Sequence, residues 1–309
     1  MILTVTCNPA LDTTYVVDGL VTEGVNRVKS VTVVPGGKGV NVSRVLAQMG
    51  EPTMVTGLAD GYFGPHLEDH GPGHADLSVD FVEALDLIRR TVVVHDRSGG
   101  TTSLWEPGYP APEWAEAALI DKVSGLLTCA HALVVSGSLA PGLPADLPAR
   151  LAEVATAAGV PTLLDVDGDP LRCGAQTEAV VMPNEEEFRR LIGNQGPVDA
   201  VGAVRGIGRS APTVVTLGGR GMVVVDADDA WHAEPLSALS GNPTGAGDSA
   251  AAAVALGLAR GWDWPRTLRE AVAVSAAAVL TPTAGSYDVD AYAAWRDAVP
   301  VTSVNTFEI

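Results

Sequence analysis

A glycine-rich turn that opens directly into an alanine-rich helix is the stretch of this sequence best suited to chemistry. It runs from Asn242 to Ser249 with the order Asn-Pro-Thr-Gly-Ala-Gly-Asp-Ser, and it continues into Ala250–Leu258. The first amides of a helix have no partner within the helix and lie at the positive end of its dipole. Such a turn binds anions, so we expect a phosphate group here.

Asp248 stands inside this turn, where its carboxylate would be repelled by the anion that the turn is suited to hold. A proton acceptor would explain its presence. It can take the hydrogen of a substrate hydroxyl while the amides of Gly245, Ala246 and Gly247 stabilise the transferring phosphoryl group. Two other interpretations stay open. Asp248 could be an N-cap in a tight turn. The stretch also fits a dinucleotide-binding pattern, although a polar loop at 233–240 stands where that pattern needs a strand.

Composition narrows the class of protein. The chain has 309 residues, of which 47% are hydrophobic, enough for a large core, and its length alone would suggest about two domains. Its net charge of −18 and pI near 4.5 argue against nucleic acid or an anionic membrane surface as a partner. No apolar run reaches the roughly 18 residues of a membrane span, and no export signal begins the chain. Cys7, Cys129 and Cys173 are widely spaced, as reduced thiols of a cytoplasmic protein would be.

The histidines do not predict a metal site. His66, His70 and His74 have a spacing that would place them on one helix face, but Gly71–Pro72–Gly73 would break that helix. We interpret these histidines as a solvated surface.

Short, β-branched runs alternate with helix-length segments over most of the chain. The strands are expected at Val55–Leu58, Thr91–Val94, Leu133–Ser136, Thr162–Asp165, Val180–Met182, Val214–Leu217 and Met222–Val225. Helices are expected at Glu113–Leu127, Asp146–Ala158, Asp199–Arg209, Pro265–Leu280 and Val289–Asp297. This alternation predicts an α/β fold with a mostly parallel sheet between two layers of helices.

Two hairpins depart from the alternation. Val16–Val34 and Arg89–Trp105 each contain two strand-like runs around turn residues. They could pair into a small separate sheet, which would serve as a lid over a ligand cleft, although an edge extension of the main sheet is the alternative. We therefore expect one domain over residues 1–309, with lid insertions at about 13–35 and 87–106.

The start of the chain supplies further candidates. Ile2–Thr6 should be a buried strand that brings Asp12 to its carboxyl end, where ligands bind in open α/β sheets. Pro35–Gly36–Gly37–Lys38–Gly39 is a second glycine loop before a helix, and it lacks the residues that would close a Walker A loop. At the other end, Thr302–Ile309 is expected to be frayed.

Five motifs in order resemble those of the ribokinase-like (PfkB) carbohydrate kinases. They are Gly36–Arg44, Ser136–Gly137–Ser138, Asn184–Glu187, Val215–Gly221 and Thr244–Ser249. Within that family, Asn8–Asp12 and the lysine of the first glycine loop look most like the 1-phosphofructokinase and tagatose-6-phosphate kinase branch. The resemblance implies a three-layer ribokinase-like fold with a small β-sheet lid. It also implies ATP-dependent phosphorylation of a ketohexose phosphate to the bisphosphate, with fructose 1-phosphate, fructose 6-phosphate and tagatose 6-phosphate as candidates.

The resemblance also implies roles for individual residues. Asp248 would be the base, and the amides of Gly245, Ala246 and Gly247 the anion hole. The sugar would be bound by Asp12, Gly36, Gly37, Asn41 and Ser138, and its phosphate by Lys38, Arg27 and Arg89, with Arg90 as the neighbouring candidate. Asn184, Thr216, Gly218 and Gly221 would bind the nucleotide, and Glu187 would hold Mg²⁺ through water. Glu185–Glu187 could instead be an acidic first helical turn.

The family precedent further implies a homodimer formed through the lid. Two positions depart from the family pattern: Met182 stands where a lysine is usual, and Val166–Asp167 where a Thr-Ser pair is frequent. Two alternatives therefore stay open. The acceptor could be an unphosphorylated sugar or a nucleoside, or the chain could be an inactive nucleotide-binding regulator.

Overall fold

A large, mostly parallel sheet forms the centre of the structure, which is a computed structural model that describes residues 1–70, 76–194, 196–209, 211–236 and 241–309. Its strands follow the order β15-β14-β13-β12-β11-β10-β9-β1-β4-β5, and β6 also pairs with β4. The strands from β5 to β12 are parallel, whereas β12 to β15 are antiparallel. The strand bounds are β1 Ile2–Thr6, β4 Thr53–Ala59, β5 Leu77–Val79, β6 Val82–Glu83, β9 Ala132–Ser136, β10 Thr162–Asp165, β11 Val180–Val181, β12 Thr213–Thr216, β13 Met222–Val225, β14 Ala230–Ala233 and β15 Val301–Ser303.

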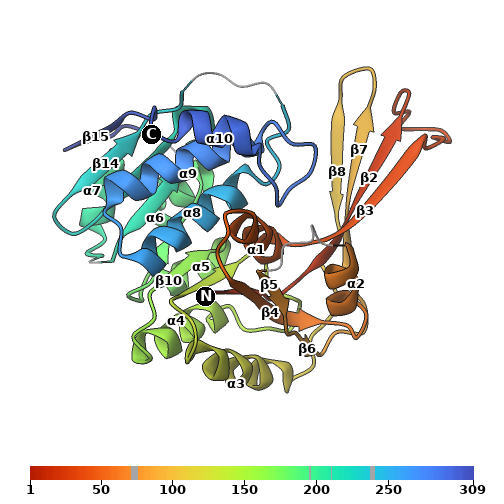
Figure 1. Cartoon of the computed structure of the whole chain (residues 1–309), viewed down its shortest axis with the longest axis horizontal. Helices are drawn as coiled ribbons and strands as arrows, with labels where there is room; N and C mark the ends of the chain where they lie inside the picture. Colours follow the sequence, from red (N-terminus) through yellow and green to blue (C-terminus); the bar gives the residue numbers. More distant parts are fainter. Residues whose placement is uncertain (71–75, 195, 210, 237–240) are drawn as a thin grey trace.

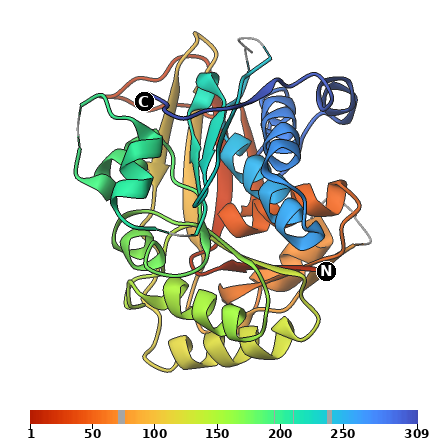
Figure 2. The same ribbon diagram turned by 90° about the vertical axis from the view of Figure 1, so that its left-hand side faces the viewer.

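Helices cover both faces of this sheet, as Figures 1 and 2 show. One face packs against α1 (Lys38–Gln48), α8 (Ala246–Arg260), α9 (Trp264–Ala278) and α10 (Val289–Trp295). The other packs against α2 (Phe63–His70), α3 (Ala115–Leu127), α4 (Leu147–Ala157), α5 (Gly168–Gly174), α6 (Glu185–Ile192) and α7 (Ala200–Gly206). The predicted three-layer α/β/α arrangement is confirmed. The parallel strands carry continuous apolar runs because both of their faces are buried.

A smaller sheet of four strands projects from the body (Figure 1). Its order is β3 (Ser30–Gly36), β2 (Ala10–Val17), β7 (Arg89–Asp96) and β8 (Thr101–Trp105). The β2–β3 and β7–β8 pairs are antiparallel hairpins, and β2 and β7 join the two hairpins in parallel. The hairpin expected at Arg89–Trp105 is confirmed, whereas the first hairpin starts at Ala10 and not at Val16. The two hairpins form one separate sheet, which we call the lid.

Two expectations about the ends of the chain are corrected by the structure. The strand expected at Ile2–Thr6 is confirmed as β1, and Asp12 lines the cleft, but Asp12 does not follow β1 as a loop residue because it belongs to the lid strand β2. Thr302–Ile309 is not frayed. β15 pairs with β14, Ile309 is 4% exposed, and Ile309 exchanges backbone hydrogen bonds with Val198. Both differences concern pairings between residues far apart in the sequence.

No helix in the described part of the chain is long and apolar enough to span a bilayer. Among the same residues, no group of three or more His, Cys, Asp or Glu side chains could hold a metal ion. The histidine prediction is only partly testable, since His66 lies on α2 while His74 falls outside the described residues.

Candidate active site

A cleft of about 1000 Å³ lies between the lid and the carboxyl edge of the central sheet. The strands and helix starts at this edge bring together residues from across the chain. Of the predicted site residues, those that line the cleft are Asp12, Gly37, Lys38, Asn41, Arg89, Ser138, Asn184, Glu187, Gly245 and Asp248. The two glycine loops thus face one cavity, as the sequence pattern requires for transfer between two substrates.

Asp248 is buried in the first turn of α8, where 7% of its surface remains exposed. Its Oδ2 accepts a hydrogen bond of 2.8 Å from Nδ2 of Asn41, the residue one turn into α1. Burial raises the pKa of Asp248 to about 6, and the nearby charge of Lys38 opposes this rise. A carboxyl with this pKa is largely ionised at neutral pH and can still gain a proton, which is the property required of a general base.

Of the three residues predicted to supply amides at the start of α8, Gly245 lines the cleft, whereas Ala246 and Gly247 do not. Gly245 has φ of +86°, and a Cβ there would lie 2.8 Å from Cα of Ala284, so only glycine fits. Within the described part of the chain, no acceptor pairs with the amides of Gly245 and Gly247. The Ala246 amide instead donates to the Pro243 carbonyl at 3.2 Å, which closes the turn.

The first glycine loop joins the lid to α1. Gly36 is the last residue of β3, and a Cβ there would clash with the carboxylate of Asp12. Gly37 precedes the helix with φ of +108°, close to Thr6 and Pro9. Gly36 therefore makes room for Asp12 between two lid strands, and Gly37 brings the start of α1 close to the end of β1.

Lys38, the first residue of α1, does not point at the lid. Its Nζ donates to Oδ1 of Asp165 at 3.1 Å. Asp165 raises the pKa of Lys38, with further contributions from Asp248 and Glu187, so the amine stays protonated. Asp165 had no role in the sequence-based prediction. Its position at the end of a buried strand, where ligands bind in α/β sheets, could have indicated one. Its Oδ2 accepts from the Ser136 hydroxyl at 2.7 Å.

Asp12 reaches the cleft from the lid. Its Oδ1 accepts a short hydrogen bond from the Thr91 hydroxyl on β7. Burial raises the pKa of Asp12, and the Thr91 hydrogen bond together with the charges of Arg44 and Arg89 opposes the rise. Asp12 is suited to accept hydrogen bonds from sugar hydroxyls, but its position is set by the lid sheet.

The adjacent arginines of β7 face opposite sides of the lid because side chains alternate along a strand. Arg89 lines the cleft, where Nε donates to the Asn8 carbonyl at 3.2 Å and Nη1 to the Glu106 carbonyl at 3.1 Å. Arg90 lines a different cavity. Arg27 does not line the cleft: it is exposed in the connection between β2 and β3. Of the lid arginines considered, Arg89 is thus the one that this chain brings to its own cleft.

Arg44 is a residue that the sequence argument quoted within a motif but gave no role. It lies on α1, lines the cleft and is 2% exposed, yet its Nε and Nη2 have no hydrogen-bond partner in the described structure. Burial lowers its pKa to about 10, and Asp12 opposes this change. The sequence shows that Arg44 is charged and lies in an apolar helix. It does not show that the guanidinium is buried.

Ser138 is held at the cleft by Asn8, whose Nδ2 donates to Ser138 Oγ at 3.1 Å and to the Pro107 carbonyl at 3.0 Å. Pro107 follows the lid strand β8. Asn8 therefore ties the end of the lid to the loop after β9, and it is a second residue whose role the sequence argument missed.

Asn184 and Glu187 form a capping box at the start of α6. The Glu187 amide donates to Asn184 Oδ1 at 2.9 Å, and the Asn184 amide donates to Glu187 Oε2 at 2.8 Å. Both side chains line the cleft, and burial raises the pKa of Glu187. One oxygen of Glu187 is used in capping, which leaves the other for a ligand. A single carboxylate suits Mg²⁺ that keeps most of its water, and it does not suit a metal held by protein groups alone.

The remaining nucleotide candidates lie beside Asn184 but outside the cleft surface. Thr216 ends β12 and forms a parallel bridge with Asn184. Gly218 and Gly221 belong to the turn that joins β12 to β13, and a Cβ on Gly221 would clash with the Ala233 carbonyl. Gly221 therefore has a packing reason to be glycine that is independent of a ligand.

The two departures from the family pattern have different surroundings. Met182 is buried in the core, with 3% exposure. Val166 and Asp167 line the cleft, and Arg190 Nη2 lies 3.0 Å from both carboxylate oxygens of Asp167. That pairing offsets the negative charge which Asp167 adds near the anion site.

Comparison with known proteins agrees with this geometry. Residues 6–290 match the pfkB family of carbohydrate kinases. Phosphofructokinase-2 from Escherichia coli, solved in complex with fructose-6-phosphate, is 28% identical with a TM-score of 0.85, over 96% of this chain and 98% of that chain. A possible 1-phosphofructokinase from Thermotoga maritima is 22% identical with a TM-score of 0.84, over 99% of this chain and 100% of that chain. The chain belongs to the pfkB family of carbohydrate kinases and is an ATP-dependent sugar kinase.

Proposed function

We propose that this enzyme transfers the γ-phosphoryl group of ATP to a hydroxyl of a ketohexose phosphate and forms the bisphosphate. Asp248 takes the proton of the acceptor hydroxyl as that oxygen forms its bond to phosphorus. The bond from phosphorus to the β-γ bridging oxygen breaks, and ADP leaves with that electron pair. The unpaired amides of Gly245 and Gly247 stabilise the charge on the transferring group.

The observation that carries this proposal is the placement of Asp248. Its carboxylate is buried at a helix start, beside unpaired amides, and faces the cavity that also contains the first glycine loop. A carboxyl used only as a structural cap would bond to the amides of its own turn. Asp248 is instead bonded to Asn41 of another helix.

The surrounding cations support a division of the cleft into two anion sites. Lys38 is near Asp165, Asp248 and Glu187, which places it on the path of the transferring phosphoryl group. Arg89 and Arg44 are both near Asp12, at the lid end of the cleft. We assign the phosphate already present on the acceptor to the lid end, with Arg89 as its main partner.

Glu187 and Asn184 would hold Mg²⁺ through water, and bound Mg²⁺ would neutralise charge on the ATP phosphates. Asn41 orients Asp248, since its amide nitrogen fixes one carboxylate oxygen and leaves the other free for the acceptor.

An ADP-release assay over fructose 1-phosphate, fructose 6-phosphate, tagatose 6-phosphate and their unphosphorylated sugars tests the acceptor class. We expect turnover with one or more of the phosphates and a much larger Michaelis constant for the free sugars. Arg89→Gln should raise the Michaelis constant for the phosphate by about tenfold or more, as expected for the loss of a charge-assisted contact. An unchanged constant in that variant, together with efficient use of a free sugar, would favour a neutral acceptor.

Asp248→Asn tests the base. The variant should lose nearly all turnover, by roughly a factor of 10³ or more, because the acceptor proton then has no base to receive it. ATP should still bind, since Asn is close in size and leaves the amides in place. Turnover close to that of the unchanged enzyme would remove Asp248 from the mechanism.

We also propose that the enzyme is a homodimer formed through its lids. Val31 and Val33 on β3 and Leu104 on β8 are 56%, 45% and 60% exposed, whereas Thr32, Val34, Ser103 and Trp105 on the same strands line the cleft. By strand alternation, the exposed apolar residues lie on the lid face turned away from the cleft. An apolar face of this kind is characteristic of a protein interface. A tetrameric inhibited form has been solved for the Escherichia coli relative, so the number of subunits needs direct measurement.

A further inference from the structure

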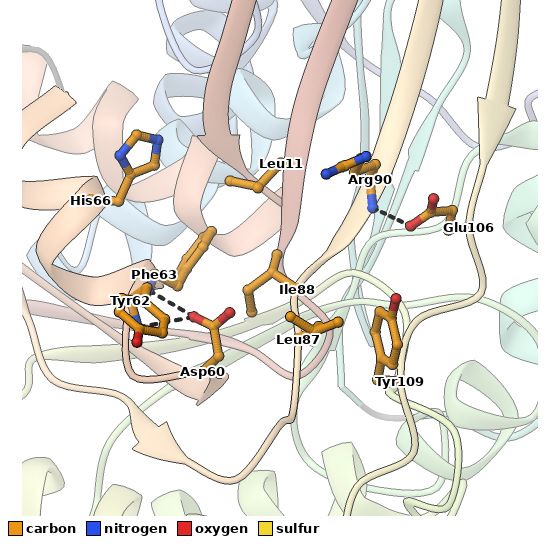
Figure 3. Close-up of a pocket in the computed structure, with 10 residues that line it drawn as sticks. All are labelled: Leu11, Asp60, Tyr62, Phe63, His66, Leu87, Ile88, Arg90, Glu106 and Tyr109. Atoms are coloured by element: carbon orange, nitrogen blue, oxygen red, sulfur yellow. Dashed lines mark hydrogen bonds between the residues drawn. The ribbon is translucent and has the colours of Figure 1, made fainter.

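A second cavity, of about 530 Å³, lies at the base of the lid on the side away from the active cleft (Figure 3). Its walls come from the end of β4, the start of α2, the lid strands β2 and β7, and the segment after β8. The residues that line it are Leu11, Asp60, Tyr62, Phe63, His66, Leu87, Ile88, Arg90, Glu106 and Tyr109. Its size is within the range of small-molecule sites.

The register of the lid explains why there are two cavities. Ala10 pairs with Arg89, Leu11 with Arg90, and Asp12 with Thr91. Because neighbouring residues on a strand point to opposite faces, Asp12, Arg89 and Thr91 line the active cleft while Leu11 and Arg90 line the second cavity.

The floor of this cavity is apolar and its rim is aromatic. Phe63 and Ile88 are buried beneath it, with 2% and 8% exposure. Tyr62, Leu87 and Tyr109 are 84%, 53% and 37% exposed around it. Large side chains exposed beside a hollow with an apolar floor are suited to contact the faces of a flat molecule.

One charged group of the cavity, the Arg90 guanidinium, is available to pair with an anionic group of a ligand. Asp60 Oδ1 accepts hydrogen bonds from the amides of Tyr62 and Phe63 at 3.0 and 2.8 Å, and Glu106 Oε2 accepts from the Arg90 amide at 2.7 Å. Both carboxylates therefore accept hydrogen bonds from backbone amides. The Arg90 guanidinium extends toward Leu11 in Figure 3, and no acceptor in the described structure engages it.

We propose that this cavity is a second ligand site, for a small organic anion with a flat apolar body. The anionic group pairs with the Arg90 guanidinium, and the flat body lies on the apolar floor between Tyr62 and Tyr109. This binding step does not depend on the assignment of the acceptor.

Occupancy of this site should also alter acceptor binding, which is the part that rests on the proposed function. Two residues of this cavity adjoin residues of the active cleft along the chain: Leu11 precedes Asp12 and Arg90 follows Arg89. Glu106 lines both cavities. A ligand that orders the base of the lid would change the affinity of the cleft, and the acceptor would change the affinity of the second site by the same factor.

Equilibrium dialysis of the full chain with 2-naphthoate, 2-naphthamide and 2-naphthylmethylammonium tests the site without requiring turnover. We expect 2-naphthoate to bind best, and saturating ATP with fructose 1-phosphate to change its affinity by a finite factor without competing for the site. Arg90→Gln should weaken 2-naphthoate by about tenfold, as expected for a lost charge-assisted pair. Arg97→Gln, which removes an arginine just beyond the far end of β7, is the matched control and should have no effect.

Tyr62→Ala provides an independent variant, since its side chain is 84% exposed and its loss should not affect folding. It should weaken 2-naphthoate severalfold and 2-naphthamide by a similar factor. Equal binding of 2-naphthoate by Arg90→Gln and the unchanged protein would overturn the proposal. So would preference for the ammonium probe, or competition in which rising substrate concentration lowers the probe affinity without limit. An affinity that falls as protein concentration rises would also overturn it, because a second copy would then fill the cavity.

Discussion

The buried carboxyl of Asp248 should make the activity of the enzyme depend on pH. Its pKa is raised to about 6 by burial, and only the ionised form can accept the proton of the acceptor. We expect kcat to fall as the pH drops through about 6, by about tenfold per pH unit below that value. A pH profile of initial rates measures this. A rate that stays level down to about pH 4.5 would show that the base is another group.

The same pKa has an opposite effect on stability. A carboxyl whose pKa is higher in the folded than in the unfolded protein binds its proton more tightly when folded, so its contribution to stability grows as pH falls from about 6 toward 4. Asp248→Asn should remove this slope. It should also raise the free energy of unfolding at pH 8 by roughly 1–2 kcal/mol, because a buried charge is lost. Urea unfolding at pH 5 and pH 8 tests both statements, and a less stable variant at pH 8 would contradict them.

Arg44 illustrates the same conflict between stability and function at a second residue. Its guanidinium is buried with two nitrogen atoms unpaired, and such a group costs free energy that a methionine of similar length does not. We expect Arg44→Met to leave the free energy of unfolding unchanged or higher. Its acceptor Michaelis constant should rise by about tenfold, because Asp12 loses a nearby positive charge. Arg150→Met, an exposed arginine on α4, is the control and should leave the Michaelis constant unchanged.

At the scale of elements, the start of α8 depends on one left-handed residue. Gly245→Ala would need φ of +86° for alanine and would place Cβ 2.8 Å from Ala284, so we expect a loss of about 2 kcal/mol or more in stability and a large loss of kcat. Gly247→Ala should fold normally, since a Cβ there meets no atom within 4 Å. Gly125→Ala in the exposed middle of α3 should be stabilising, by roughly 0.5–1 kcal/mol. Thermal unfolding and initial rates are measured for all three variants. Gly245→Ala reports on backbone strain, whereas Gly247→Ala and Gly125→Ala report on an added methyl group without that strain.

The elements that the sequence predicted well are those with local causes. The glycine loops were recognisable because Gly37 and Gly245 adopt backbone conformations that other residues avoid. The buried parallel strands were recognisable because both of their faces are covered, which requires continuous apolar runs. Asp248 and Asn41 lie within these loops and helix starts, so their meeting in one cleft followed from the order of the elements.

The features that the sequence did not predict depend on contacts between distant segments. The choice between Arg89 and Arg90 is made by the register of β2 against β7, and the pairing of Lys38 with Asp165 joins α1 to the end of β10. The lid strand that contains Asp12 was missed because the chain pairs again from Ala10, with β3 and β7, which are distant in sequence. The C-terminal segment was expected to fray because its partners, β14 and Val198, are far from it in sequence.

For the whole molecule, two effects oppose each other when two copies associate through their lids. The exposed apolar face favours association, and the net charge of −18 on each copy opposes it. Like charges repel the two copies and salt screens that repulsion, so dimerisation should strengthen as ionic strength rises from about 0.01 to 0.15 M. Val31→Glu with Leu104→Glu should give a monomer by light scattering, because each places a carboxylate on the face that a partner would cover. Ser124→Glu, on the exposed surface of α3 and away from the lid, is the control for an added charge. The monomer should keep Asp248 and the glycine loops intact and show a raised acceptor Michaelis constant, since Asp12 and Arg89 are held by the lid.

A double variant that remains a dimer would place the interface elsewhere. A monomer with unchanged kinetics would show that the lid orders the acceptor site without a partner.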